Sequence, residues 1–368
     1  MLTYSRQDGI GKLFSVLQNS PLQRVDAEWT AFSSKDDASK QESTIHQHQV
    51  EVWCKRDDLL HPQISGNKWR KLSKPLHDFT QSAPSHVLSF GGPYSNHLHA
   101  LAYCCKQLNI KFTAVIRGAY LQDQALNQTL KDLKDWDTQL VFVDKQSYQK
   151  RTDLDYLAKL RTEHNADIII PEGGSQPDAL FGMQTMIDEI TAANSSKPFD
   201  AILLPVGSGA SMAGVVESCR AQTALQIIGI GVLKGEGYLE HLVDQFLTSS
   251  HKSTNKDTPY LPWHINHNFH FGGYAKTTPE LKAFCRDFNR QQAALTKMDA
   301  KQDTPVNLKQ NPKQDTPIYI EPVYSGKCFF ALKTLIQQGY FAPNSKILLI
   351  HTGGLQGARQ QVNSTVTW

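Results

Sequence analysis

The chain has 368 residues, of which 40% are hydrophobic and 20% are charged. This composition is that of a folded globular protein and excludes a fibrous or largely disordered chain, and the length favours two domains or one large domain with a lobe. The formal net charge of +3 comes without a concentrated block of Lys and Arg, so we expect neither nucleic acid nor a membrane as a partner, whereas a small acidic substrate is compatible.

The cysteines and the first residues indicate the compartment. The six cysteines include no Cys-x-x-Cys pair, which predicts reduced thiols. Residues 1–6 do not lead into a basic region followed by a long apolar one, and no apolar run is long enough to span a bilayer. We therefore expect a cytoplasmic protein.

The segment from residue 87 to residue 182 alternates short apolar runs with amphipathic stretches. The predicted strands are residues 87–90, 112–116, 140–143 and 167–170. The predicted helices are residues 98–108, 123–136 and 153–164. Such alternation predicts a parallel sheet with helical crossovers, and we assign residues 72–182 to a small α/β domain.

A second alternating set follows. Its predicted strands and helices are residues 183–190, 201–204, 227–231, 239–247, 330–338 and 346–350. The sequence therefore predicts an α/β fold of two lobes with parallel-sheet cores, in which residues 1–71 and 183–368 form the larger domain. Residues 249–259 are interpreted as a surface loop, and residues 291–317, rich in Lys, Gln, Asp, Asn and Pro, as a polar insertion of low complexity.

The first segment with chemical information is Ser-Gly-Asn-Lys-Trp-Arg-Lys at residues 65–71, which follows Lys-Arg-Asp-Asp at residues 55–58. Lys68 opens a predicted helix in this segment. Burial and neighbouring cations would lower the pKa of this lysine, which favours imine formation with an aldehyde cofactor. The alternative interpretation is an exposed turn, because most lysines lie on the surface.

The second segment, residues 89–97, joins a predicted strand to a predicted helix. Free backbone N–H groups at a helix N-terminus attract carboxylates. Ser95 and Asn96 are therefore candidate binding residues, and the alternative is that they only cap the helix.

The third segment, residues 204–214, places a glycine-rich loop between a strand and a helix, where main-chain donors can wrap a phosphate. The candidate phosphate ligands are Gly207, Ser208, Gly209, Ala210 and Ser211. The loop lacks the lysine of a P-loop and does not read Gly-x-Gly-x-x-Gly from Gly207. A ligand smaller than a nucleotide is therefore favoured, with a plain tight turn as the alternative.

The remaining two segments are residues 320–327, a turn with Tyr324 and Ser325 at its apex, and residues 350–354, where His-Thr-Gly-Gly follows an apolar strand. Glycines after a buried strand let the backbone approach a ligand at the carboxyl edge of a parallel sheet. Each segment taken alone also fits a plain strand-to-helix turn.

In their order, these segments resemble the 1-aminocyclopropane-1-carboxylate (ACC) deaminase and D-cysteine desulfhydrase family, whose members are fold-type II, tryptophan synthase beta-like enzymes that use pyridoxal 5'-phosphate (PLP). The shared motifs are Lys-Arg-Asp-Asp, Gly-Asn-Lys-x-Arg-Lys, Gly-Gly-x-x-Ser-Asn-His, Gly-Ser-Gly-Ala-Ser-x-Ala-Gly, Pro-Val-Tyr-Ser-Gly-Lys and His-Thr-Gly-Gly. The resemblance implies a homodimer that acts on a small amino acid.

The resemblance also implies which residues bind the cofactor. Lys68 would carry PLP as an imine, with Asn67 beside it. Asn96 would donate a hydrogen bond to the phenolic oxygen, the loop from Gly207 to Ser211 would hold the phosphate, and Ser325 would face the pyridine nitrogen.

Substrate contacts are implied in the same way. The helix end at Ser95, Asn96 and His97 would receive the substrate carboxylate, with Tyr94 next to it in a place where glutamine is usual. The candidate catalytic residues are Lys68, Ser95, Tyr274 and Tyr324. Both tyrosines resemble family residues that face the substrate.

Ser325 bears on the choice of reaction. Its position resembles an acidic residue in ACC deaminases and a hydroxyl residue in D-cysteine desulfhydrases, and a hydroxyl leaves the ring mostly unprotonated. The weaker electron sink suits loss of a good leaving group such as thiolate. We therefore favour α,β-elimination from D-cysteine to pyruvate, ammonia and sulfide; the alternatives are an ACC deaminase and a non-catalytic PLP- or phosphate-binding protein.

Overall fold

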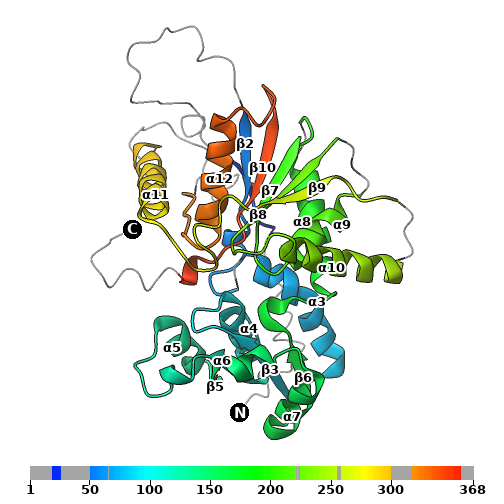
Figure 1. The fold of residues 1–368 in the computed structure, drawn as a ribbon. Coiled ribbons are helices and arrows are strands. Elements are labelled where there is room, and N and C mark those ends of the chain that lie inside the picture. Colours follow the sequence, from blue (N-terminus) through cyan, green and yellow to red (C-terminus); the bar gives the residue numbers. More distant parts are fainter. Residues whose placement is uncertain are drawn as a thin grey trace. The chain divides into compact units, whose positions relative to one another are not determined.

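The computed structural model describes residues 19–25 and 50–357, except residues 65, 195, 221, 223, 255–257 and 300–315. The described chain divides into two compact units. The first unit contains Leu60–Met186 with residues 19 and 354–357, and the second contains Ser20–Leu59 and Ile187–Gly353. Each unit has its own sheet, so the expected two-lobed α/β architecture with parallel-sheet cores is confirmed (Figure 1).

The sheet of the first unit is entirely parallel and has the strand order β5-β4-β3-β6. Its strands are β3 (His86–Gly91), β4 (Lys111–Arg117), β5 (Gln139–Val143) and β6 (Ile168–Ile170). Its helices are α3 (Asn67–Ser82), α4 (Asn96–Gln107), α5 (Gln128–Asp135), α6 (Lys145–Gln149) and α7 (Leu154–His164). The strands predicted for this region are confirmed to within two residues at each end.

Successive strand residues in the first unit face opposite sides of its sheet, as the two-residue period of a strand requires. Val87 and Ala114 pack in the core that includes α3, α4 and α5. Leu88 and Val115 pack in the core on the other side, with Tyr148 of α6 and residues of α7. Burial on both faces accounts for the continuous apolar runs of β3 and β4.

The sheet of the second unit has the order β1-β2-β10-β7-β8-β9 and is parallel except for β1 against β2. Its strands are β1 (Leu22–Arg24), β2 (Glu51–Lys55), β7 (Ala201–Val206), β8 (Gln226–Gly231), β9 (Trp263–Asn266) and β10 (Lys346–Ile350). Its helices are α9 (Ala210–Ser218), α10 (Tyr238–Thr254), α11 (Pro279–Asp299) and α12 (Ser325–Gln337), and α8 (Ala179–Ala193) crosses the boundary of the units.

Parallel pairing brings the segments that follow β2, β7, β8 and β10 to one edge of this sheet. The glycine-rich loop follows β7, and His-Thr-Gly-Gly follows β10. The carboxyl edge of a parallel sheet is where ligands bind in such folds. Helices α11 and α12 pack with the sheet in one apolar core (Figure 1).

The first unit begins before the domain boundary expected at residue 71. Leu60, Ile64, Trp69 and Leu72 are buried in the core of this unit. The start of α3 and Lys68 therefore belong to the first unit, whereas the sequence analysis placed residues 1–71 in the other domain.

Two segments that were interpreted as loops are helical. Helix α10 continues to Thr254, and α11 continues to Asp299, so residues 291–299 are not part of an insertion; residues 300–315 lie outside the described residues. Polar side chains of α11 point inward because they bind backbone. Asn289 Nδ2 donates to the Ile320 carbonyl at 3.0 Å, and the Ile318 N–H donates to Gln292 Oε1 at 3.2 Å.

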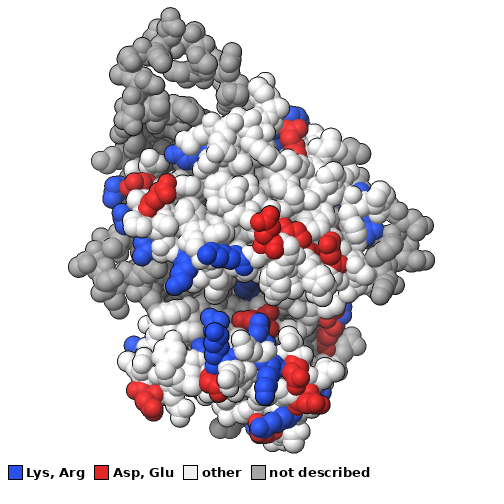
Figure 2. Space-filling model, in the orientation of Figure 1, with Lys and Arg blue, Asp and Glu red and all other residues white. Residues whose placement is uncertain are grey.

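The distribution of surface charge and the state of the cysteines agree with what the composition led us to expect. All six cysteines are buried and free, which confirms the prediction of reduced thiols. On the face drawn in Figure 2, basic and acidic side chains of the described residues lie among uncharged ones, and no surface of one sign extends across it. No helix in the described ranges combines the length and apolar character needed to cross a bilayer.

Candidate functional site

Lys68 lies in the first turn of α3, two residues after a glycine with a positive φ. Gly66 has φ 70°, in the left-handed region, and precedes the helix. Lys68 Nζ donates to Asn67 Oδ1 at 3.0 Å. Desolvation lowers the pKa of this ammonium from 10.5 to about 8, so a substantial fraction of the amine is neutral near physiological pH.

Another lysine, Lys71, lies one turn further along α3 and is buried, whereas Lys68 is half-buried. Its Nζ donates to the Gly173 carbonyl at 3.2 Å and to Ser175 Oγ at 3.1 Å. Burial, and then the charge of Lys68, hold the pKa of Lys71 well below its usual value. Lys71 therefore fixes the turn around Gly173 to α3. The lowered pKa of Lys68 comes from burial and not from the neighbouring cation that was expected.

His97 is buried in α4, and its hydrogen bonds fix its tautomer. Ser89 Oγ donates its proton to the Ile170 carbonyl at 2.7 Å, so the 2.8 Å contact between Ser89 Oγ and His97 Nε2 requires a proton on Nε2. Nδ1 is then an acceptor, and within the described part of the chain it is buried without a hydrogen-bond partner. Burial, followed by the charges of Lys68 and Lys71, keeps the pKa of His97 far below its usual value.

The sequence left open whether Ser95 and Asn96 cap the helix or bind a ligand, and the two residues differ in this respect. Ser95 is the N-cap of α4, because its Oγ accepts the Leu98 N–H at 3.2 Å. Asn96 begins the helix, and its buried Oδ1 has no hydrogen-bond partner among the residues that the structure describes. A buried, unpaired amide oxygen next to a helix N-terminus is a polar group suited to a ligand. Tyr94, in the preceding turn, is exposed.

The glycine-rich loop of the second unit joins β7 to α9. Gly209 has φ 77° and precedes the first residue of α9. A Cβ at Gly209 would lie 3.0 Å from Leu242 Cβ and 3.1 Å from the Val243 nitrogen, so only glycine fits. The loop thus keeps its backbone close to α10 and leaves Gly207, Ser208, Ala210 and Ser211 at the positive end of the α9 dipole.

Tyr324 and Tyr274 contact each other near this loop. The Tyr324 hydroxyl donates to the Tyr274 hydroxyl at 3.2 Å, and the rings meet edge to face with centroids 6.1 Å apart. A Cβ at Gly207 would lie 3.6 Å from Tyr324 Cε1. The second unit therefore brings both predicted tyrosines and the predicted phosphate loop together.

Ser325 is buried at the start of α12 and is bonded to Glu321. Ser325 Oγ accepts the Glu321 N–H at 2.9 Å and donates toward Glu321 Oε1 at 3.2 Å. The Glu321 carboxylate also accepts the N–H groups of Val323, Tyr324 and Ser325 at 2.6–2.9 Å. Burial raises the pKa of Glu321, and these N–H groups oppose that shift.

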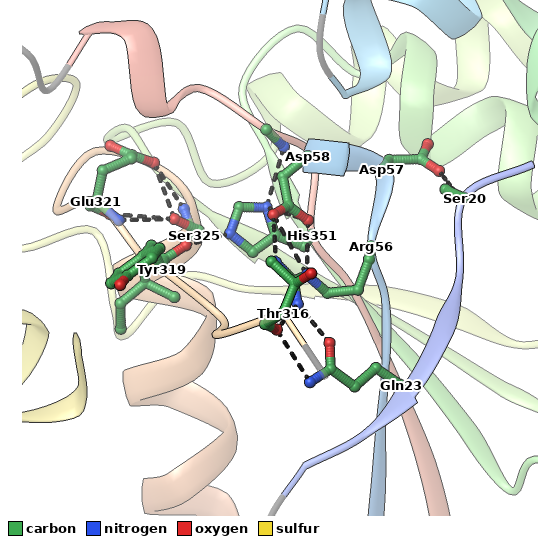
Figure 3. Close-up of polar contacts among 12 residues, drawn as sticks. Ser20, Gln23, Arg56, Asp57, Asp58, Thr316, Tyr319, Glu321, Ser325 and His351 are labelled. Carbon is green, nitrogen blue, oxygen red and sulfur yellow. Dashed lines mark hydrogen bonds and ion pairs between the residues drawn. The ribbon is translucent and has the colours of Figure 1, made fainter. Parts of the chain in front are cut away.

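The Lys-Arg-Asp-Asp motif has structural contacts in the second unit (Figure 3). The Arg56 guanidinium pairs with Asp58 at 2.7 Å and donates to the carbonyls of Thr316 and Pro317 at 2.8 and 3.0 Å. His351 donates from Nε2 to the Tyr319 carbonyl at 2.7 Å and accepts the Gly353 N–H at Nδ1. These bonds tie the segment before α12 to β2 and to the end of β10.

Every predicted site residue is described, and each unit gathers its own set. The first unit contains Asn67, Lys68, Tyr94, Ser95, Asn96 and His97, and the second contains Gly207, Ser208, Gly209, Ala210, Ser211, Tyr274, Tyr324 and Ser325. Glu321 and Lys327, both inside the 320–327 segment, were not among the predicted site residues. Glu321 lies before α12, so no helical spacing indicated its hydrogen bond to Ser325.

Comparisons with known proteins point to one family of enzymes. Residues 39–296 match the family described as "Pyridoxal-phosphate dependent enzyme". The chain is 27% identical to "Putative 1-aminocyclopropane-1-carboxylate deaminase" of Pyrococcus horikoshii, a match that covers 84% of this chain and 86% of the relative. It is 26% identical to the mitochondrial "Bifunctional D-cysteine desulfhydrase/1-aminocyclopropane-1-carboxylate deaminase" of Arabidopsis thaliana, covering 85% of this chain and 75% of the relative.

The fold has a solved counterpart. The crystal structure of an ACC deaminase homologue superposes with a TM-score of 0.72 and 24% identity, covering 93% of this chain and 91% of that one. The resemblance inferred from the motifs and the tryptophan synthase beta-like fold are therefore confirmed.

Proposed function

Since the chain belongs to the family of pyridoxal-phosphate-dependent enzymes, we propose that it binds PLP through Lys68 and eliminates the β-substituent of a small amino acid, D-cysteine first among candidates. The products would be pyruvate, ammonia and sulfide, from one D-cysteine and one water. The single observation that carries the proposal is the position of Lys68 in the first turn of α3, where its amine lies 3.0 Å from Asn67 Oδ1 and burial lowers its pKa to about 8.

The residues present fit the cofactor. A phosphate suits the loop at the start of α9, because Gly209 allows the backbone to turn where a Cβ would clash. Among the described residues the buried Asn96 Oδ1 has no hydrogen-bond partner, so it could accept from a ligand, while the N–H₂ group of the same amide would donate to the phenolic oxygen. Ser325, with its hydroxyl bonded only at 3.2 and 3.4 Å as a donor, would face the pyridine nitrogen.

PLP supplies an electron sink for bond cleavage at the substrate α-carbon. The chain's own residues would do the rest. Neutral Lys68 would remove the α-proton, which its lowered pKa permits near neutral pH. The α4 N-terminus at Ser95 and Asn96 would bind the substrate carboxylate, and the His97 Nδ1 acceptor would take a hydrogen bond from a substrate donor group. Tyr274 and Tyr324 would face the leaving group.

A second candidate is ring opening of ACC to 2-oxobutanoate and ammonia. One observation favours it: the hydroxyl of Ser325 contacts the buried carboxylate of Glu321. An acidic group one hydrogen bond away from the pyridine nitrogen could strengthen the electron sink that a hydroxyl alone leaves weak. We propose a homodimer for either activity.

Product assays on the PLP-loaded full-length chain rank the two candidates. We expect sulfide and pyruvate from D-cysteine, and little keto acid from ACC or L-cysteine; D-serine, with a poorer leaving group, should react more slowly. Formation of 2-oxobutanoate from ACC without sulfide from D-cysteine would replace the first candidate by the second. The absence of any keto acid would reject both.

A further inference from the structure

Lys327 is a fully buried lysine whose ammonium binds only backbone carbonyls among its described hydrogen-bond partners. Its Nζ donates to Val232 O at 3.0 Å, His270 O at 2.8 Å and Gly273 O at 2.9 Å. Burial lowers the pKa of Lys327 to about 8, with the charge of Glu321 opposing that shift, so most of this amine is an ammonium at pH 7. An ammonium has three protons and no acceptor. Each proton is therefore matched to one carbonyl oxygen.

The three carbonyls come from two separate segments. Val232 directly follows β8, and His270 and Gly273 belong to the turn that precedes Tyr274. In this turn Gly272 and Gly273 have φ of 96° and 123°, a conformation in which glycine is strongly favoured. Within the turn the Gly273 N–H donates to the His270 carbonyl at 3.0 Å and the Gly272 N–H donates to His270 Nδ1 at 2.9 Å. The ammonium adds the bonds that join this turn to α12.

Lys327 also lies one turn after Tyr324 in α12. The Tyr324 hydroxyl meets the Tyr274 hydroxyl at 3.2 Å. A single side chain on α12 therefore binds the turn that carries Tyr274, while the same helix begins beside Tyr324, the partner of Tyr274. Three carbonyl dipoles that converge on one point repel each other unless a cation lies between them.

We propose that Lys327 is a positioning residue whose ammonium acts as a built-in cation, around which the 270–274 turn folds and by which Tyr274 is held against Tyr324. The expected effect on substrate binding rests on the proposed function, in which the two tyrosines face the substrate. The expected effect of Lys327 on the backbone of the 270–274 turn does not rest on that function.

The chain offers a matched control. Lys346 is also buried in the second unit, and its Nζ has three oxygen acceptors: Asn194 Oδ1 at 2.7 Å, Ser196 Oγ at 2.6 Å and Lys197 O at 3.1 Å. It is the first residue of β10, at the amino end of the parallel strands. Replacing it removes a comparable buried ammonium without touching the 270–274 turn.

The test compares Lys327→Met with Lys346→Met in the full-length protein by hydrogen exchange. In Lys327→Met we expect the amides of residues 268–276 and 232–234 to lose about tenfold or more of their protection, with β7 and β10 unchanged. In Lys346→Met these same amides should keep their protection. Equal loss in both variants, or no loss in Lys327→Met, would overturn the proposal.

Two further measurements separate positioning from general stability. In Lys327→Ala, ammonium or methylammonium ions should restore protection of the turn, whereas sodium chloride at equal ionic strength should not. If Lys327→Met does not fold, Lys327→Gln replaces it in the exchange experiment. The glutamine amide keeps two hydrogen-bond donors, so we expect an intermediate loss of amide protection in the turn. On the active enzyme, Lys327→Gln should raise KM more than it lowers kcat. The hydrogen-exchange result tests the role of Lys327 in the turn even if the protein does not have the proposed activity.

Discussion

Ser325 and Glu321 form a buried hydrogen-bonded pair at the start of α12: the Glu321 N–H donates to Ser325 Oγ at 2.9 Å, and Ser325 Oγ lies 3.2 Å from Glu321 Oε1. A hydroxyl has a single proton. When Glu321 is ionised it competes for that proton, and when Glu321 is protonated the hydroxyl is free to donate elsewhere. The identity of Ser325 alone therefore does not determine the charge of a ring nitrogen placed next to it.

Replacing Glu321 by glutamine tests this pair. An amide N–H₂ would replace an oxygen that accepts backbone N–H groups of the first α12 turn, so we expect a loss of about 1–3 kcal/mol in the free energy of unfolding. Urea unfolding gives this value. The control is Glu280→Gln, which makes the same charge change in the exposed first turn of α11 and should cost much less. Equal losses would mean that the carboxylate contacts at Glu321 contribute little.

Lys68 should load with cofactor in a pH-dependent way. The amine reacts only when neutral, and its pKa is lowered to about 8. The rate of covalent loading of the apo chain with PLP should therefore rise with pH and level off above about 8. Stopped-flow absorbance measures it. A rate that keeps rising toward pH 10.5, the ordinary pKa of lysine, would show that burial does not activate this amine.

In the loop before α9, replacement by alanine should destabilise the protein at Gly209 and not at Gly207. Gly209→Ala forces a Cβ to within 3.1 Å of the Val243 nitrogen at φ 77°, and we expect it to cost about 1–3 kcal/mol of stability and to weaken PLP binding. At Gly207 the nearest atom to a new Cβ lies at 3.5 Å, an ordinary contact. Gly207→Ala should therefore unfold at nearly the same temperature as the parent. Thermal unfolding of both variants decides the point.

The tautomer of His97 predicts that His97→Asn and His97→Gln change the KM for the amino acid to different extents. His97→Asn places a polar atom near the former Nδ1, and His97→Gln places one near the former Nε2, which contacts Ser89. If Nδ1 is the atom that serves the substrate, His97→Gln should raise KM for the amino acid several-fold more than His97→Asn does. Steady-state kinetics at fixed PLP measures both. The reverse order would assign His97 a structural role through Ser89.

The sequence predicted much of this fold because the strands are buried on both faces, which makes β3, β4, β7 and β10 continuous apolar runs. It failed where polar residues point inward. The end of α11 reads as a polar insertion because Asn289 and Gln292 bind backbone instead of water. Strand β2 was missed because Lys55 lies in it and is buried against Glu189 at 2.6 Å.

The sequence was sufficient to predict the motifs of the candidate site, but not the contacts that their side chains make. The glycines and the Ser95 cap follow from local geometry, so sequence pattern indicates them. The role of Lys327 depends on partners that lie far along the chain, at Val232 and His270. A charged residue in an apolar segment gives no sign of such partners until the fold is known.

The central claim is that Lys68 carries the cofactor, and borohydride reduction tests it most directly. The full-length chain, loaded with PLP and reduced, would be digested and mapped by mass spectrometry. We predict a phosphopyridoxyl group on Lys68 and none on its buried neighbour Lys71, and no reducible visible band in Lys68→Arg. A label on another lysine, or a chain that binds PLP without any reducible band, would contradict the account.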